Sequence, residues 1–193
     1  MAETAHADVL EHVGPWTEQD YLALPTERQR IELLDGSLLV SPSASNQHRR
    51  LSSHLWFALS AAAPANLEVL EAINVRVAPG TILIPDLTVV DTPGADRTVN
   101  EPADVVLVVE ITSPGNAIVD RALKPQLYAQ ADIPHYLRVE QGDDGPGAVL
   151  YQLKHNSYLE VARADPGHPL VLTEPISVTL DLAALSSATR PPR

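Results

Sequence analysis

The sequence predicts an α+β or mixed α/β domain, in which helices pack on a central β-sheet. Three observations support this prediction. Val105–Val109 is a continuous apolar run rich in β-branched residues, which is typical of a strand covered on both faces. A segment that begins at Ser45 places its apolar residues at helical spacing. Asp35 and Gly36 separate two apolar runs, as in a tight hairpin.

The first half of the chain contains six expected elements, bounded by capping or turn residues. They are a helix over 17–24, hairpin strands over 30–34 and 37–41, a helix over 45–63, and strands over 67–77 and 81–90. Thr17 and Asp20 have the spacing of a capping box, and Pro25 stops the first helix. Ser45 is the expected N-cap of the second helix, which Pro64 ends.

The second half continues with alternating strands and one helix. Its expected elements are a strand over 105–109, a helix over 120–131, a strand over 135–139, hairpin strands over 148–153 and 157–164, and a last strand over 176–180. Gln141–Gly147 holds three Gly and one Pro, which predicts a loop. Pro125 is tolerated only in the first turn of a helix, so this helix should start near Arg121 and place Lys124 close to its N-terminus.

Length and composition limit the class of protein. The 193 residues predict a flexible lead-in over 1–16, one domain over 17–185 and a disordered tail over 186–193. The absence of Cys excludes a disulfide scaffold, a thiolate zinc site and a thiol nucleophile. No apolar stretch approaches the ~18 residues of a membrane span. Residues 1–11 lack the basic and apolar runs of a signal peptide, so a cytoplasmic location is expected.

The net charge of −12 argues against a protein that coats DNA, because an acidic surface repels phosphates at long range. An enzyme acting on nucleic acid is still allowed, since acidic residues gathered around metal ions reverse the local sign of charge.

Two carboxylates interrupt apolar strands and are the first candidates for chemistry. Glu110 ends the most apolar run, where a buried carboxylate requires a cationic partner, although it could also emerge at the sheet edge and cap a turn. Asp86 follows Pro85, which removes a ladder hydrogen bond and suggests an edge strand or a bulge that directs the side chain into a site. The alternative for Asp86 is an ordinary turn residue beside proline.

Two further charged residues are candidates with simple alternatives. Glu32 alternates with apolar neighbours in the first strand, a pattern usually produced by a solvated face. Asp120, Lys124 and Tyr128 recur every four residues and so share one face of a helix. Lys124 could simply form a surface ion pair with Asp120. However, 11 of the 13 basic residues are Arg, and a compact ammonium at this position suits a water or a phosphate.

Together these segments resemble the bacterial Uma-type family of restriction-endonuclease-like proteins, over about Thr17–Leu185. The resemblance rests on the order and spacing of Tyr21–Pro25, Ile31–Pro42, His48, Pro85-Asp86-Leu87, Val109–Pro114, and Asp120-xxx-Lys124-xxx-Tyr128. It implies the PD-(D/E)XK nuclease fold, with a restriction-endonuclease-like core and a central mixed sheet flanked by helices.

The resemblance also implies a site. Pro85-Asp86 matches the "PD" and Glu110 matches the acid of the second half, but Thr112 stands where the family motif usually has Lys. Lys124 matches a helix Lys that takes its place, and Glu32 matches an acidic residue from the N-terminal part. Such a site would hold Mg²⁺ or Mn²⁺ through Asp86, Glu110, the Ile111 backbone carbonyl and Glu32.

The catalytic set implied is therefore Asp86, Glu110, Lys124 and Glu32. His48 matches a His common at the head of its helix, with a capping or packing role as the alternative. Tyr128 is an accessory candidate for which packing is the alternative. Asp132 replaces a frequent Gly, which is tolerable because Asp accepts positive φ.

Three functions compete on these residues. The first is a Mg²⁺- or Mn²⁺-dependent endonuclease acting on DNA, for which cleavage of both strands would favour a homodimer. The second is a degenerate nuclease fold that acts as a binding or interaction module, which the acidic charge and the missing Lys favour. The third is a metal hydrolase acting on a small phosphorylated substrate.

Overall fold

The computed structural model describes residues 12–25, 30–112 and 122–187. Its larger sheet has six strands in the order β11 (Ser157–Ala164), β10 (Gly145–Lys154), β9 (His135–Gly142), β8 (Val105–Thr112), β6 (Leu87–Val90) and β3 (Glu68–Glu71). The β8–β9 pair is parallel and the other pairs are antiparallel, so the central sheet is mixed, as expected.

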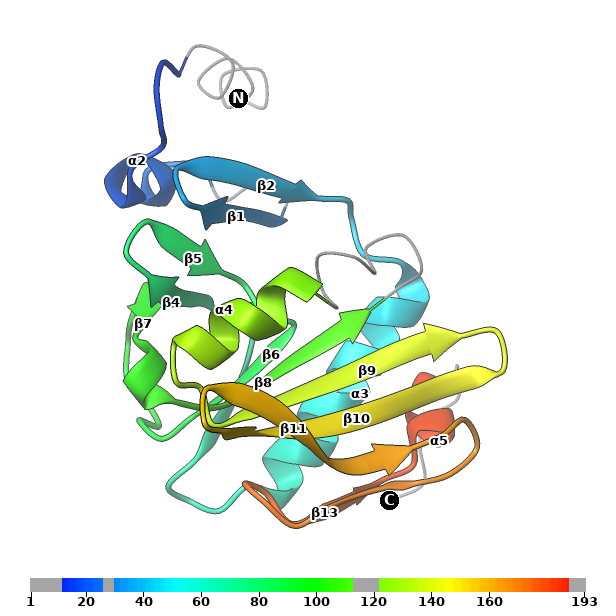
Figure 1. The fold of residues 1–193 in the computed structure, drawn as a ribbon. Helices are drawn as coiled ribbons and strands as arrows, with labels where there is room; N and C mark the ends of the chain where they lie inside the picture. The colour runs from blue at the N-terminus through cyan, green and yellow to red at the C-terminus, as the bar shows by residue number, and fades with distance from the viewer. Residues whose placement is uncertain (1–11, 26–29, 113–121, 188–193) are drawn as a thin grey trace.

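A second sheet carries the N-terminal hairpin (Figure 1). Its order is β2 (Ser37–Ser41), β1 (Arg30–Leu34), β5 (Thr81–Leu83), β4 (Asn74–Ala78) and β7 (Val99–Asn100). The predicted Asp-Gly hairpin is confirmed, because Asp35 and Gly36 both have positive φ, at 45° and 74°. A short ribbon pairs β12 (Leu170–Leu172) with β13 (Val178–Leu180).

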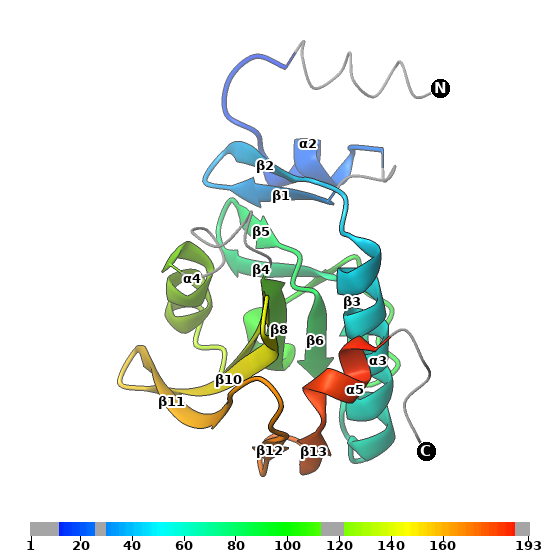
Figure 2. The same cartoon turned by 90° about the vertical axis from the view of Figure 1, so that its right-hand side faces the viewer.

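Helices lie on both faces of the six-stranded sheet. Figure 2 shows α3 (Asn46–Ala62) and α4 (Lys124–Gln130) on opposite sides of β6 and β8. The remaining helices in the described part of the chain are α2 (Glu18–Leu22), α5 (Leu182–Ser186) and the 3₁₀ helix η1 (Pro102–Asp104). None of the helices in the described residues is long and apolar enough to cross a membrane.

Strand β8 contributes side chains to the hydrophobic clusters on both faces of the six-stranded sheet, because successive side chains of a strand point to opposite faces. Leu107 and Val109 pack in the cluster that contains Leu55 of α3. Val108 packs on the other face, in the cluster that contains Tyr128 of α4. Glu110 has the same parity as Val108, and its carboxylate therefore reaches α4.

Two expected strands are each divided between the two sheets, which corrects the sequence-based boundaries. The run 67–77 breaks at Ala72, whose φ is 50°, into β3 and β4. The run 81–90 leaves one sheet after Leu83 and enters the other at Leu87. Asp86 therefore lies on a crossing between two sheets, and the expected edge strand or bulge is wrong. Pro85 suits this crossing because no ladder hydrogen bond is needed there.

Other boundaries also differ from expectation. The loop predicted at 141–147 is wrong: β9 and β10 pair as far as Gly142 and Gly145, so Asp143 and Asp144 alone connect them. Strand β11 pairs with β10 only from Ala148 onward, so Pro146 has no partner strand on that side of β10. The ribbon strand β12 and the helix α5 were not predicted, and α5 includes Ser186 of the expected tail.

The described part of the Lys124 helix starts at Lys124, with Pro125 in its first turn as predicted, while Asp120 and Arg121 lie outside the described residues.

The N-cap of α3 gives a stability prediction. Ser45 has an extended backbone, and its Oγ accepts the backbone N–H of His48 at 3.2 Å. We expect Ser45→Ala to lower the free energy of unfolding by about 1 kcal/mol, because an orphan helix N–H loses its acceptor. Ser53→Ala, on an exposed position of the same helix, serves as the control and should lie within about 0.5 kcal/mol of the parent in urea denaturation. Equal values for the two variants would contradict a capping role.

Candidate functional site

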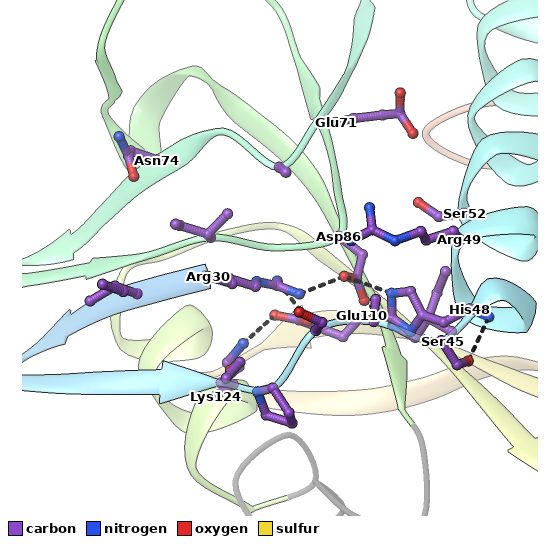
Figure 3. Close-up of a pocket in the computed structure, with 18 of the residues that line it drawn as sticks. Arg30, Ser45, His48, Arg49, Ser52, Glu71, Asn74, Asp86, Glu110 and Lys124 are labelled. Atoms are coloured by element: carbon purple, nitrogen blue, oxygen red, sulfur yellow. Dashed lines mark hydrogen bonds and ion pairs between the residues drawn. The ribbon is translucent and has the colours of Figure 1, made fainter. Parts of the chain in front are cut away.

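Asp86 and Glu110 meet at the junction of the two sheets. Leu87 of β6 pairs with Val109 of β8, so the next residues along these antiparallel strands are Asp86 and Glu110. Both carboxylates contact Arg30 of β1, whose Nη1 lies 2.6 Å from Asp86 Oδ1 and whose Nη2 lies 3.5 Å from Glu110 Oε2. The two acids therefore share one cation (Figure 3).

Asp86 is held from three directions. Besides the Arg30 contact, Oδ1 lies 3.1 Å from His48 Nε2, and Oδ2 accepts the backbone N–H of Ile111 at 2.7 Å. Burial by itself would raise the pKa of Asp86, but the Arg30 charge, the His48 contact and the Ile111 N–H lower it to about 2. Asp86 is thus a carboxylate at neutral pH, with fixed orientation.

Glu110 is bound by two side chains from α4. Its Oε1 accepts the Tyr128 hydroxyl at 2.6 Å and the Lys124 ammonium at 3.1 Å. Only 2% of Glu110 is exposed, and this burial raises its pKa to about 7, although Lys124 and Arg30 oppose the shift. The same burial raises the pKa of Tyr128 well above 10, so its hydroxyl remains a proton donor.

Lys124 joins Glu110 to Glu32, although the helix begins with Lys-Pro. Its Nζ lies 3.1 Å from Glu32 Oε1, and that oxygen also accepts the backbone N–H of Ile84 at 2.7 Å. Glu32 is fully buried, so the solvated-face alternative is wrong. The surface ion-pair alternative for Lys124 is wrong as well, because its side chain is buried among carboxylates.

Two residues of the site, His48 and Arg30, were not assigned contacts with the acids from the sequence. The His48 ring reaches Asp86 from the first turn of α3, so it contacts the site rather than only packing or capping. Arg30 was not among the expected residues. It is the first residue of β1, and no local sequence pattern marks an arginine at this position as a site residue. Its partners, Asp86 and Glu110, come near it only because the chain crosses between the two sheets at Asp86.

A cleft of about 990 Å³ opens beside this cluster. Arg30, His48, Asp86, Glu110 and Lys124 line it, together with Arg49 of α3. In Figure 3, Ser45, His48, Arg49 and Ser52 approach the acids from the α3 wall. The cleft thus carries basic groups in a protein of net charge −12.

The raised pKa of Glu110 predicts a pH dependence of stability. Between its ordinary value of 4.5 and about 7, the folded chain retains a proton that the unfolded chain has lost. This contribution to stability is full below about pH 4.5 and disappears as pH rises through about 7. We expect Glu110→Gln to remove a decline of at most about 3 kcal/mol across this window.

The check is the free energy of unfolding from pH 4 to 8. Glu160→Gln serves as a control, because Glu160 is exposed and Arg163 lowers its pKa rather than raising it. If the parent and Glu110→Gln curves run parallel throughout, Glu110 does not titrate in this range.

Comparisons with known proteins agree with this architecture. The family model described as "Uma2: Putative restriction endonuclease" matches residues 18–184. The chain belongs to the Uma2 family. A solved structure described as a "putative nuclease belonging to DUF820" from Anabaena variabilis superposes with a TM-score of 0.72. It shares 12% sequence identity and covers 90% of this chain and 100% of its own, which shows a common fold. No curated protein matches the sequence significantly.

Proposed function

We propose that this Uma2 chain is a divalent-metal-dependent endonuclease that hydrolyses DNA phosphodiester bonds, with Asp86, Glu110, Glu32 and Lys124 as its site. The observation that carries the proposal is the pair Asp86 and Glu110, which face one shared cation at the wall of a cleft. Family membership supports a nuclease, and the basic groups of the cleft support a substrate that carries phosphates.

The carboxylate oxygens of the site suit a hard cation. Glu32 Oε2 is buried without a hydrogen-bond partner among the described residues, and the His48 Nε2 nitrogen lies 3.1 Å from Asp86 Oδ1. Within those residues no group of three or more His, Cys, Asp or Glu is preassembled for a metal. Mg²⁺ commonly binds through one or two carboxylates, with waters and substrate phosphates completing its shell. Asp86 and Glu110 fit that mode, with the Ile111 carbonyl and Glu32 as supporting oxygens.

When bound there, a divalent ion would polarise the scissile phosphate and lower the pKa of a water. The protein groups then have separate tasks. Lys124, buried beside Glu110, would orient the attacking water and stabilise negative charge on the phosphate oxygens. Tyr128 donates a hydrogen bond to Glu110 and His48 contacts Asp86, so both act as positioning residues. Water would attack phosphorus and lose a proton, the P–O bond to the leaving oxygen would break, and that oxygen would take up a proton, so that one water is consumed for each bond hydrolysed.

A second function is favoured by one observation. Arg30 and Lys124 already neutralise much of the acidic cluster, so the fold holds its carboxylates together without a metal. A nuclease-fold protein that binds DNA or another partner without cutting would show the same contacts. Its DNA binding would not depend on divalent ions.

Supercoiled plasmid DNA distinguishes the two functions. We expect the parent protein to convert it to nicked or linear forms in Mn²⁺ or Mg²⁺, and to stop when EDTA is added. A parallel reaction with the Asp86→Asn variant excludes a contaminating nuclease. DNA retardation without cleavage in either metal, unchanged by EDTA, would support the binding module and refute the enzyme.

A further inference from the structure

The guanidinium of Arg30 stands where two acids of the candidate site converge. It is 2.6 Å from Asp86 Oδ1 and 3.5 Å from Glu110 Oε2, and it approaches from β1, in the opposite sheet to β6 and β8. A cation that bridges two carboxylates of adjacent strands is the arrangement in which a divalent ion would also bind. Both cannot contact the same oxygens at once, because their charges repel and their volumes overlap.

The hydrogen-bond donors of the Arg30 guanidinium are only partly used in this position. Its Nε and Nη2 are buried, and neither has a hydrogen-bond partner within the described residues. A guanidinium has five donor hydrogens, and leaving buried ones unused is costly. One quarter of the side chain is nevertheless exposed, and the residue lines the cleft, so there is open space beside the side chain into which the head group can turn.

Lys124 differs from Arg30 on each of these points. Its side chain is only 4% exposed, and its ammonium is 3.1 Å from both Glu110 and Glu32. Compared with Lys124, Arg30 is therefore the side chain that can withdraw from the acids. Its removal would leave Glu110 Oε2 and Asp86 Oδ1, which His48 Nε2 still contacts at 3.1 Å, facing the position that the guanidinium had occupied.

We propose that Arg30 and a divalent metal ion bind the Asp86–Glu110 pair in mutual exclusion, so that Arg30 sets the metal affinity of the site. This inference rests on the proposed metal-dependent function. It makes a prediction opposite in sign to the usual effect of removing a site residue: loss of the Arg30 charge should tighten metal binding. In the metal-free protein the same loss should lower the melting temperature, because two buried acids lose a counter-ion.

The test measures Mn²⁺ binding by isothermal titration calorimetry, together with the melting temperature with and without Mn²⁺. The variants are Arg30→Met and Arg30→Gln; the second keeps a hydrogen-bond donor near Asp86 if the first does not fold. Arg76→Met is the matched control, because Arg76 also pairs with two carboxylates, those of Glu18 and Glu101, and is 31% exposed. It does not line the cleft.

We expect both Arg30 variants to bind Mn²⁺ about tenfold more tightly than the parent, with a larger Mn²⁺-induced rise in melting temperature. Arg76→Met should lose stability and keep the parent affinity. If the parent binds Mn²⁺ and the Arg30 variants bind it equally or more weakly, exclusion is refuted while the metal-dependent function stands. If neither the parent nor any Arg30 variant binds Mn²⁺, both the exclusion and the metal site are refuted.

Discussion

Replacing Asp86 by Asn should lower the rate of DNA cleavage by about 10³-fold or more. The substitution keeps the size of the side chain and an oxygen that can accept the Ile111 N–H. It removes the negative charge that the surroundings maintain, since the pKa of Asp86 is lowered to about 2. A neutral amide is a weak ligand for a hard cation, so the loss should appear in cleavage rather than in folding.

Asp104→Asn provides the matched control for this substitution. Asp104 is a half-buried carboxylate that, like Asp86, pairs with an arginine (Arg97), but it lies in η1 and does not line the cleft. Its variant should cleave at the parent rate. Single-turnover cleavage at saturating Mn²⁺, with circular dichroism to confirm folding, gives both rates. Similar rates for Asp86→Asn and Asp104→Asn would remove Asp86 from the reaction.

Lys124 should tolerate neither Ala nor Arg. We expect both variants to lose about 10²–10⁴-fold in cleavage, because the ammonium orients water and stabilises charge on the phosphate. Arg keeps the positive charge, but a planar guanidinium does not fit a position where one ammonium is shared by Glu32 and Glu110 at 3.1 Å each. Mn²⁺ affinity should survive in both variants, since Lys124 supplies no ligand.

The other lysine of the chain is the control for Lys124. Lys154 ends β10 on the surface, and Lys154→Arg should cleave like the parent. The same plasmid assay, with Mn²⁺ titrations alongside, separates a loss of chemistry from a loss of metal. Full activity in Lys124→Arg would show that positive charge alone is needed, and full activity in Lys124→Ala would exclude any catalytic role.

The sequence predicted the acids and the lysine because local patterns mark them. Glu110 ends a run of β-branched residues, Asp86 follows a proline, and Lys124 shares a helical face with Tyr128. The structure brings Tyr128 and Lys124 to the same oxygen of Glu110, which is the consequence of that spacing. Asp132 has the positive φ that was expected of it, at 58°. The domain boundaries and the metal stay predictions.

What the sequence could not predict depends on contacts between distant segments. Arg30 and Asp86 are 56 positions apart, and neither side chain indicates the other as its partner. The division of two apolar runs between two sheets also follows from tertiary packing, since Ala72 adopts a positive φ that its type does not favour. The loop predicted at 141–147 failed for a similar reason: pairing with β9 extends β10 through residues that usually form turns.

We propose that Asp86 and Glu110 together hold the divalent ion on which DNA cleavage depends. Anomalous diffraction from a crystal soaked in MnCl₂ tests it most directly. We predict one strong peak in contact with oxygens of both carboxylates, with the Arg30 guanidinium moved away from them. Bound Mn²⁺ elsewhere, with Arg30 still bridging Asp86 and Glu110 in a protein that cleaves DNA, would show that these two carboxylates do not hold the catalytic ion.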